Sequence, residues 1–366
     1  MNALSSGASP SGTHTALCSD LTTGRVSPDG SDPSVSFTSV TSVTSLACCA
    51  MQPDASPDPP PPLVLLATGT DCWEVDEDAP LLLPALRALG VNPVPAIWHD
   101  RTVDWAAADL VVVRSTWDYT LRRDEFIQWA ESVALLSELA NPPAVLRWNT
   151  DKRYLEDLER DGIAVVRTAF LSGAETGAEE IRDALTSNLG PSGEVVVKPS
   201  ISAGSKDTGR FGSVQLDAAV VLAQQILRGD RTAMIQPYLP SVDQRGETGL
   251  VYFAGRYSHA FNKGPLLAPG GETEHGLFAL ESISEHRATE AELAAGAEIL
   301  DLVTARFGAA PLYSRVDLVE DPHGEPVLLE LELTEPSWFL TTDASAPARA
   351  AAALVDHLRK SSSRRA

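Results

Sequence analysis

The fold of this chain is decided near its C-terminus, where Ser314-Arg315-Val316-Asp317-Leu318-Val319 precedes, after an Asp-Pro-His-Gly turn, Leu328-Leu329-Glu330-Leu331-Glu332-Leu333-Thr334-Glu335-Pro336-Ser337. Both stretches have the apolar content of buried strands, yet acids interrupt them. Glu330 and Glu332 lie two residues apart, so on a strand their side chains leave the same face. Burying two like charges together is costly unless a cation compensates them. With Asp317 as a third carboxylate, the set suits Mg²⁺ that also holds nucleotide phosphates. In the alternative, the acids of an edge strand face water.

Composition excludes several classes of protein. With 366 residues the chain is long enough for two or three lobes around their own cores. Its formal net charge of -22 is not offset by a basic run, so we expect neither a nucleic-acid partner nor a membrane partner. No apolar stretch approaches the length of a membrane span. The cysteines form no disulfide framework and no zinc spacing, so the expected location is the reducing cytoplasm.

Residues 1–61 differ in composition from the rest of the chain. They are rich in Ser, Thr, Pro, Gly and Asp and end in a proline run. Such a segment cannot bury enough apolar surface to offset the entropy of ordering, which predicts a disordered extension. The mildly apolar stretch 37–51 lacks a basic region before it, so we reject a targeting signal. A translation start nearer Met51 is the alternative.

From residue 63 onward, strand-like and helix-like stretches alternate. Strands at 63–68 and 108–113, with helices at 80–89 and 124–139, predict a parallel sheet with helices on its faces. A new unit begins after Asn141-Pro142-Pro143. The elements expected in it are helices at 151–161, 176–189, 217–228, 290–307 and 346–358 and strands at 164–171, 194–198, 234–239, 250–253 and 256–261.

Several motifs of this second unit are typical of anion or nucleotide sites. Lys198 ends an apolar strand beside a loop of small residues, 199–212, whose backbone N–H groups suit a phosphate. Lys152 stands in the first turn of a helix, where a cation is disfavoured without an anionic partner. In Gln236-Pro237-Tyr238-Leu239-Pro240, a strand leaves the sheet and its backbone groups become free for another partner. The alternatives are turn glycines, a solvated lysine and an edge strand bent by prolines.

The first unit contributes its own candidates at the end of a core strand, where open α/β folds bind ligands. Arg114 follows that strand, and its planar fork suits a substrate carboxylate. Asp118 would pair with a substrate ammonium, and Trp117 and Tyr119 would wall the pocket. The alternative is a surface Arg–Asp pair beside packed aromatic rings.

Taken in order, these features resemble the ATP-grasp superfamily, particularly the glutathione-synthetase type of ATP-binding domain, from about residue 63 to the end of the chain. The stretches 114–119, 147–154 and 330–337 are similar to the branch that contains the O-ureido-D-serine cyclo-ligases of cycloserine biosynthesis. The resemblance implies an α/β ATP-grasp fold. An N-terminal parallel α/β domain, 62–145, would be followed by an ATP-grasp domain, 146–366, whose two α+β lobes (about 164–240 and about 241–366) clamp the nucleotide.

The resemblance also implies a role for each motif. Lys152 and Lys198, with Ser202 and Gly204 in the adjacent loop, would contact phosphates; Gln236, Tyr238 and Leu239 would hold adenine, and Glu247 the ribose; Asp317, Glu330 and Glu332 would carry Mg²⁺, with Mn²⁺ as an alternative; Lys263 and Arg315 would meet the γ-phosphate or the activated carboxylate. Many relatives have Asn in place of Glu332, which leaves the number of metal ions open. Glutathione synthetases carry an arginine where this chain has Gly249.

The expected function is an ATP- and Mg²⁺-dependent ligase that turns a small amino-acid-like carboxylate into an acyl phosphate for attack by a nitrogen nucleophile. Loops 200–212 and 268–285 would close over the nucleotide and exclude water. An intramolecular cyclo-ligase is expected if the chain follows the cyclo-ligase branch. The alternatives are an intermolecular carboxylate–amine ligase, an ATP-grasp kinase and a non-catalytic ATP-binding regulator. The expected partner is a small-molecule carboxylate; a homodimer is common among relatives, although nothing in the chain indicates one.

Overall fold

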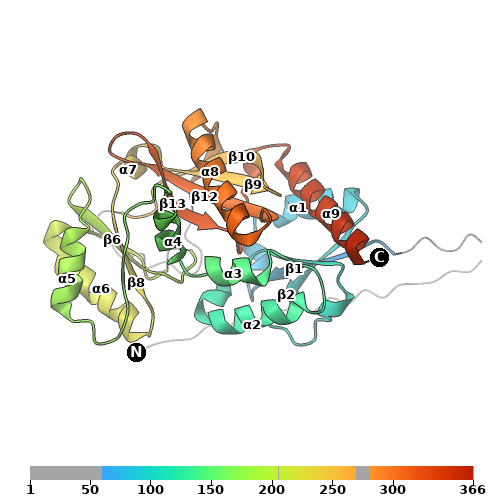
Figure 1. Ribbon diagram of the computed structural model, residues 1–366, viewed down its shortest axis with the longest axis horizontal. Coiled ribbons are helices and arrows are strands. Elements are labelled where there is room, and N and C mark those ends of the chain that lie inside the picture. The colour runs from blue at the N-terminus through green and yellow to red at the C-terminus, as the bar shows by residue number, and fades with distance from the viewer. Residues whose placement is uncertain (1–59, 205, 269–280, 366) are drawn as a thin grey trace, which may run out of the picture. The chain divides into compact units, whose positions relative to one another are not determined.

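The computed structural model describes residues 60–204, 206–268 and 281–365 (Figure 1). Contacts along the chain separate Met1–Pro57 from Asp58–Ala366, and every described residue belongs to the second part. The predicted extension, apart from residues 60 and 61, and most of the predicted closing loop 268–285 therefore lie outside the described residues. Within the described ranges, no helix is long and apolar enough to cross a membrane.

The first sheet is entirely parallel, which confirms the α/β beginning expected from the sequence. Its order is β2-β1-β3-β4, formed by β1 (Leu63–Thr68), β2 (Asn92–Ile97), β3 (Leu110–Val113) and β4 (Leu139–Ala140). The sequence does not predict β2, because Pro93 and Pro95 argue against a strand. The strand lies at the edge of the sheet, where a missing N–H need not break a ladder.

Helices cover both faces of this sheet. Leu66 and Val112 pack with α1 (Ala79–Ala88), whereas their neighbours Leu65 and Val111 pack with α2 (Arg123–Ala134). This follows from the alternation of side chains along a strand. Helix α2 ends five residues before the predicted end at 139, and Leu139 belongs to β4 instead.

The second sheet is antiparallel and has the order β5-β8-β6-β7. Its strands are β5 (Ala169–Leu171), β6 (Glu194–Pro199), β7 (Gly209–Gly212) and β8 (Ala233–Pro237). Helices α5 (Ala178–Ser187) and α6 (Leu216–Arg228) bury Ile181, Leu185 and Ile226 against it (Figure 1). Strand β7 falls inside the stretch that the sequence predicts as a loop, because two of its four residues are glycines.

The third sheet is also antiparallel and contains the two acidic strands that were quoted first. Its order is β11-β10-β9-β12-β13, formed by β9 (Glu247–Phe253), β10 (Arg256–Lys263), β11 (Ile283–His286), β12 (Tyr313–Glu320) and β13 (Pro326–Glu332). Helix α8 (Glu290–Phe307) has the predicted bounds, set by a capping box between Thr289 and Glu292 and by Gly308 in the left-handed region.

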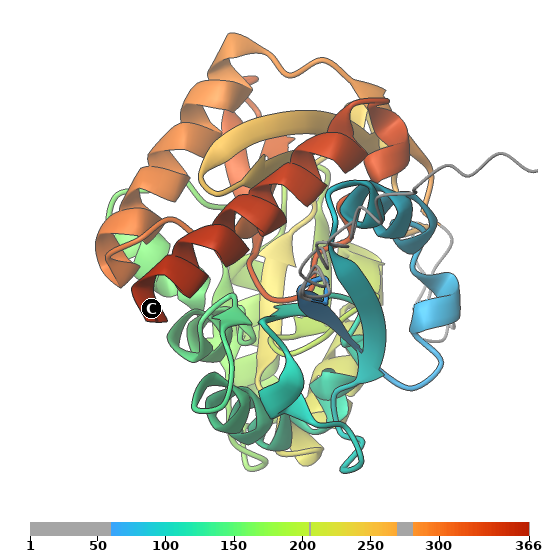
Figure 2. The same ribbon diagram turned by 90° about the vertical axis from the view of Figure 1, so that its right-hand side faces the viewer.

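The remaining elements connect these sheets. The helices are α3 (Pro143–Asn149), α4 (Tyr154–Arg160), α7 (Ser241–Arg245) and α9 (Ala346–Arg365), and short 3-10 turns occupy Trp73–Val75, Trp105–Ala107, Trp117–Leu121, Ser213–Gln215 and Leu340–Thr342. Helix α9 extends beyond the predicted residue 358 and contacts α1, β9 and β10 (Figure 2). The mixed parallel and antiparallel sheets agree with the predicted α/β ATP-grasp fold.

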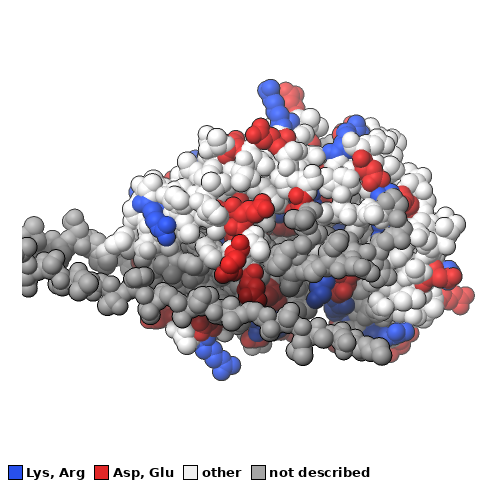
Figure 3. Space-filling model, turned by 180° about the vertical axis from the view of Figure 1, so that it is seen from behind, with Lys and Arg blue, Asp and Glu red and all other residues white. Residues whose placement is uncertain are grey.

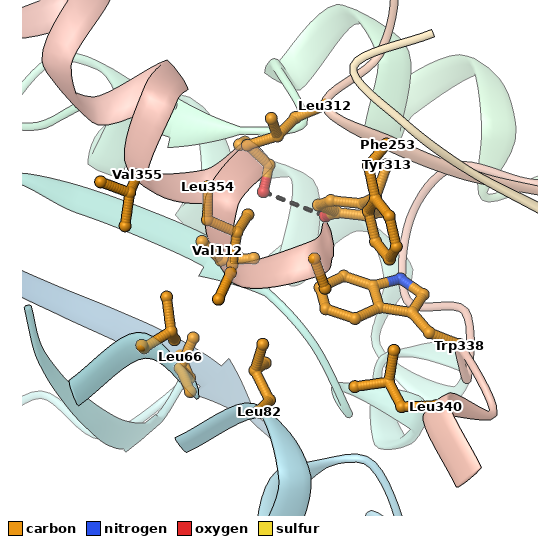
Figure 4. Packing of buried hydrophobic residues seen from close by; sticks show 14 of the residues in the cluster. Leu66, Leu82, Val112, Phe253, Leu312, Tyr313, Trp338, Leu340, Leu354 and Val355 are labelled. Atoms are coloured by element: carbon orange, nitrogen blue, oxygen red, sulfur yellow. Dashed lines mark hydrogen bonds between the residues drawn. The ribbon is translucent and has the colours of Figure 1, made fainter. Parts of the chain in front are cut away.

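One hydrophobic cluster joins the first sheet to the third. Trp338 is buried beside Phe253, Tyr313 and Leu340, in the same cluster as Leu66 of β1 (Figure 4). The Tyr313 hydroxyl donates to the carbonyl of Ala140 at 3.0 Å. Residues 62–145 and the rest of the described chain therefore share a core, which fixes one wall of the site against the acidic strands.

Candidate active site

A cavity of about 720 Å³ is lined by strands of the second and third sheets and by turns that connect the elements of the first unit. The predicted site residues in its lining are Trp117, Tyr119, Lys152, Lys198, Ser202, Gly204, Gln236, Tyr238, Leu239, Glu247, Lys263, Arg315, Glu330 and Glu332. Three predicted residues, Arg114, Asp118 and Asp317, are not part of the lining. The fold thus brings together residues as distant in the chain as Trp117 and Glu332.

Strand register places the charged side chains on one face of the third sheet. Arg315 pairs across from Glu332, and Asp317 pairs across from Glu330, so the four side chains form a square. Gly249 of β9 lies beside Asp317 on the other side and carries no side chain. A Cβ at this glycine would collide with the ring of Phe261, its partner on β10. The Phe261 ring therefore occupies the space beside Gly249, and an arginine side chain does not fit at position 249.

Arg315 neutralises two of the predicted metal ligands. Its Nε and Nη2 donate to the two oxygens of Asp317, each at 2.8 Å, and Nη2 also pairs with Glu332. Its Nη1 donates to the carbonyl of Ser337 at 3.1 Å. Burial lowers the pKa of Arg315, but Asp317 and Glu332 outweigh it and the pKa is raised. Asp317 is therefore the partner of Arg315 in this structure, and its predicted role as a ligand of Mg²⁺ stays a prediction.

The two predicted phosphate lysines differ in their partners. Lys152 Nζ lies 3.0 Å from Glu330 and donates to the carbonyl of Ser202 at 2.9 Å, which connects the helix start to the small-residue loop. Lys198 forms no ion pair with any described residue, and burial, aided by Lys152, lowers its pKa. Lys198 is thus a partly buried amine in the cavity lining, where an anionic ligand would supply the missing counter-charge.

The partly buried carboxylates Glu330, Glu332 and Glu335 of the lining outnumber their cation partners, which are Lys152 for Glu330 and Arg315 for Glu332. Burial raises the pKa of Glu332, even though Arg315 opposes the shift, and burial raises the pKa of Glu335 to about 7. In Glu330, the effect of burial is outweighed by Lys152 and Lys198, and its pKa is lowered. Such an excess of buried negative charge is the environment that a divalent cation relieves.

A metal site fits this part of the cavity in donor chemistry, and the predicted set of Asp317, Glu330 and Glu332 stays a prediction. Within the part of the chain that the structure describes, no three His, Cys, Asp or Glu side chains converge to hold an ion. Asp317 is bound by Arg315, whereas Glu330 and Glu332 line the cavity from the same strand face. Glu330 and Glu332 are therefore the residues that would hold a metal ion together with ligand oxygens.

The hinge that follows β8 is held by a residue that the sequence analysis missed. The Tyr238 hydroxyl donates to Asp243 at 2.6 Å, and the guanidinium of Arg210 lies 3.5 Å from the centre of the Tyr238 ring. Arg210 also donates to both oxygens of Glu194 at 2.8 Å, to Asp243, and to the carbonyl of Leu267. An arginine between glycines, in Gly209-Arg210-Phe211-Gly212, is the sequence signal that could have indicated it.

The remaining nucleotide candidates also have identifiable contacts. Gln236 is buried and donates to the Thr168 hydroxyl at 2.9 Å. Lys263 Nζ lies 2.8 Å from Glu281 and 3.9 Å from Glu247, which faces Lys263 across strands β9 and β10. Burial raises the pKa of Glu247 although Lys263 opposes this. Glu247 and Lys263 therefore form a weakly paired couple at the cavity wall.

Arg114 and Asp118 do not have the geometry predicted for substrate binding. The Arg114 side chain is buried, pairs with Asp78 at 3.0 Å, and stacks 3.7 Å from the centre of the Trp338 ring. Asp118 accepts from Trp98 Nε1 at 2.8 Å, outside the cavity lining. The N–H groups of the Arg114 guanidinium donate to acceptors within the protein. Arg114 therefore stabilises the wall of the cavity and does not face a substrate.

Trp117 and Tyr119 do lie in the cavity wall, as predicted. Trp117 Nε1 donates to the carbonyl of Glu335 at 3.1 Å, and the Tyr119 hydroxyl is hydrogen-bonded to the Glu335 carboxylate. The sequence analysis missed Glu335 and the acids Asp76 and Asp78, which also line the cavity. Their signal was weak, because single acids in a turn usually face solvent.

Comparisons with known proteins agree with this geometry. Residues 64–141 match the family described as D-cycloserine synthetase DcsG, N-terminal domain. The cycloserine biosynthesis protein DcsG of Streptomyces lavendulae is 36% identical over 299 residues, which cover 81% of this chain and 99% of that protein. The crystal structure of D-cycloserine synthetase DcsG has a TM-score of 0.75 at 34% identity, covering 81% of this chain and 99% of that one.

A more distant structure shows the fold alone. The RimK-domain ATP-grasp protein of Sphaerobacter thermophilus DSM 20745 has a TM-score of 0.56 at 19% identity, covering 80% of this chain and 98% of that one. The full-length match to DcsG and the shared fold carry the assignment together. The chain therefore belongs to the D-cycloserine synthetase DcsG family of ATP-grasp ligases.

Proposed function

We propose that this ligase uses Mg²⁺ and ATP to activate the carboxylate of a small amino acid of the O-ureido-D-serine type and closes it into a ring. The observation that carries the proposal is that one cavity is lined both by the partly buried Lys198, which has no ion-pair partner among the described residues, and by the carboxylates Glu330 and Glu332. The similarity to a protein of cycloserine biosynthesis supports the choice of substrate.

The proposed reaction has two steps. A carboxylate oxygen of the substrate forms a bond to the γ-phosphorus of ATP, and ADP leaves. The oxygen-bound nitrogen of the ureido group in the same molecule then attacks the acyl carbon and gives its proton to the leaving phosphate, which departs with the electrons of the carbon–oxygen bond. The ring keeps the carbamoyl group on this nitrogen, so the ring, ADP and phosphate account for all the atoms.

Different residues of the cavity would bind different parts of the nucleotide, the metal ion and the substrate. Lys152 and Lys198 would hold the phosphates of ATP, with the hinge Gln236-Pro237-Tyr238-Leu239 beside adenine and Glu247 at the ribose. Lys263 and Arg315 would neutralise charge on the transferred phosphoryl group and on the acyl phosphate. Glu330 and Glu332 would hold Mg²⁺, which supplies charge compensation for the phosphate oxygens when it is bound; Mn²⁺ would serve in its place.

The partner that this proposal needs is a small molecule. The face in Figure 3 has Lys and Arg side chains scattered among acidic ones, among its coloured and white residues. The absence of a nucleic-acid partner stays a prediction. The cytoplasmic location and the homodimer stay predictions.

The test is ADP and phosphate release with Mg²⁺-ATP against a panel of amino acids that includes O-ureido-D-serine, run beside Glu330→Gln. We expect substrate-stimulated release that the variant loses, with a product lighter than the substrate by one water. A product of twice that size would instead indicate an intermolecular ligase. ATP binding without turnover on any carboxylate would contradict the proposal and favour a nucleotide sensor.

A further inference from the structure

One wall of the cavity has a charge that the proposed ATP site does not explain. The cations in the lining, Lys152, Lys198, Lys263 and Arg315, all come from the second half of the fold, after residue 145. The first unit instead contributes Glu74, Asp76, Glu77 and Asp78, from the turn and helix start that follow β1, and no described Lys or Arg. The first unit therefore forms an acidic wall of the cavity without a cation in the described lining, whereas the second half of the fold contributes both cations and acids. Such an acidic wall suits a positively charged group.

Asp76 is the acid on this wall with unused binding capacity. Only 5% of the residue is exposed, and its Oδ1 accepts from the backbone N–H of Asp78 at 3.1 Å and from Arg114 Nη2 at 3.4 Å. Its Oδ2 has no hydrogen-bond partner among the described residues. A buried carboxylate oxygen without a donor is costly and rare, and an absent ligand is one of its recognised explanations.

Asp76 is connected to the reacting end of the cavity by a short run of contacts. Three successive carbonyls, those of Glu335, Pro336 and Ser337, accept from Trp117 Nε1, Arg114 Nη1 and Arg315 Nη1 at 3.1, 3.0 and 3.1 Å. Arg114 thus holds the Asp76 carboxylate and the same backbone segment that Arg315 holds. The acid and the proposed acyl-phosphate cation are attached to a common support.

We propose that Asp76 binds the primary ammonium of the substrate amino acid, held in place by Arg114, and makes the enzyme selective for substrates with a free amine. An ionised carboxylate only accepts hydrogen bonds, and an ammonium offers three charged N–H donors where a hydroxyl offers one neutral donor. Inside the site the carboxylate and the ammonium are both removed from water. A charge-assisted hydrogen bond between them is strong in that environment. This inference rests on the proposed function, because it needs the substrate carboxylate to be activated beside Arg315.

The test compares two substrates and two variants. O-ureido-D-serine is set against its analogue in which a hydroxyl replaces the α-amine, with carboxylate and ureido nitrogen unchanged. For the wild-type enzyme we expect kcat/KM to favour the amine by roughly tenfold to a hundredfold. Asp76→Asn keeps an oxygen for Arg114 and the Asp78 N–H but replaces the unpartnered oxygen by an amide NH₂, and should reduce this preference to about unity.

Asp118→Asn is the matched control, because Asp118 also lies in the first unit but faces Trp98 outside the cavity. It should retain the wild-type preference, and both variants should bind ADP and unfold at close to the wild-type temperature. An undiminished preference in Asp76→Asn would overturn the inference, as would a loss confined to Asp118→Asn. Wild-type enzyme that turns over neither compound would refute the proposed function instead, so the two failures are distinguishable.

Discussion

The substitution Gly249→Ala tests how the third sheet holds its charged face. Gly249 lies on β9 between Phe261 of β10 and Asp317 of β12. A Cβ there would lie 2.6 Å from Cε2 of Phe261 and closer still to other atoms of that ring. The ring is 1% exposed and packs 4.5 Å, centre to centre, from Phe339, so it has no open space to move into.

Two opposing effects set the size of the change. Replacing a strand glycine by alanine stabilises by about 0.5–1 kcal/mol through backbone entropy. Forcing an extra methyl group into a packed core costs about 1–3 kcal/mol. The clash is thus the larger effect, and we expect a net loss of roughly 1–2 kcal/mol in the free energy of unfolding. Because the Arg315 guanidinium lies 5.8 Å from the centres of both rings, kcat should fall more than the affinity for ATP.

Urea denaturation and steady-state kinetics measure these two effects. Gly177→Ala is the control, since a Cβ at Gly177 would meet nothing within 4 Å; we expect it to change stability by less than about 1 kcal/mol. Adding Phe261→Leu to Gly249→Ala should restore part of the lost stability. Unchanged unfolding free energy and unchanged kcat in Gly249→Ala would refute the argument that this glycine makes room for the Phe261 ring.

Three further predictions follow from other contacts. Arg210→Lys should raise the KM for ATP roughly tenfold with little change in kcat, because a lysine cannot keep two bidentate pairs and the stacking on Tyr238. A fall in kcat as large as the rise in KM would count against a role in nucleotide binding. The pKa of Glu335 is raised from 4.5 to about 7 by burial, so the folded protein binds this proton more tightly and stability should decrease as pH rises through that window; Tm profiles should show that Glu335→Gln flattens part of the decrease. Asp78→Ala should cost about 3–5 kcal/mol in urea denaturation, since it leaves Arg114, Trp338 N and Leu340 N without their acceptor; a loss below about 1 kcal/mol would show that other groups replace it.

Features with a local cause could be predicted from the sequence. Helix α8 has its predicted bounds because Thr289 and Gly308 cap it, and β1 and β6 are continuous apolar runs. Strands β2 and β7 could not be predicted, because prolines and glycines are tolerated there only through their positions at sheet edges. Edge position is a property of the assembled sheet and leaves no mark in a short stretch of sequence.

The same distinction explains the site. Glu330 and Glu332 were predicted to share a face because alternation along one strand is local. The fork of Arg114 was assigned to a substrate because nothing in its neighbourhood shows that Asp78, thirty-six residues earlier, occupies it. Asp76, Arg210 and Glu335 were missed for the same reason. Their significance comes from partners that are distant in the chain.

The charge pairs of the cavity indicate why metal and nucleotide binding should be coupled. Lys152 is occupied by Glu330, Lys263 by Glu281, and Arg315 by Asp317 and Glu332. Among the described lining residues only Lys198 has no such partner, so phosphates would have to compete for the other cations. If Glu330 and Glu332 give their charge to a divalent cation, Lys152 loses its partner and Arg315 one of its two, and both can then turn toward phosphate oxygens. Glu332 would then strengthen the coupling, because it occupies Arg315 until a cation is bound.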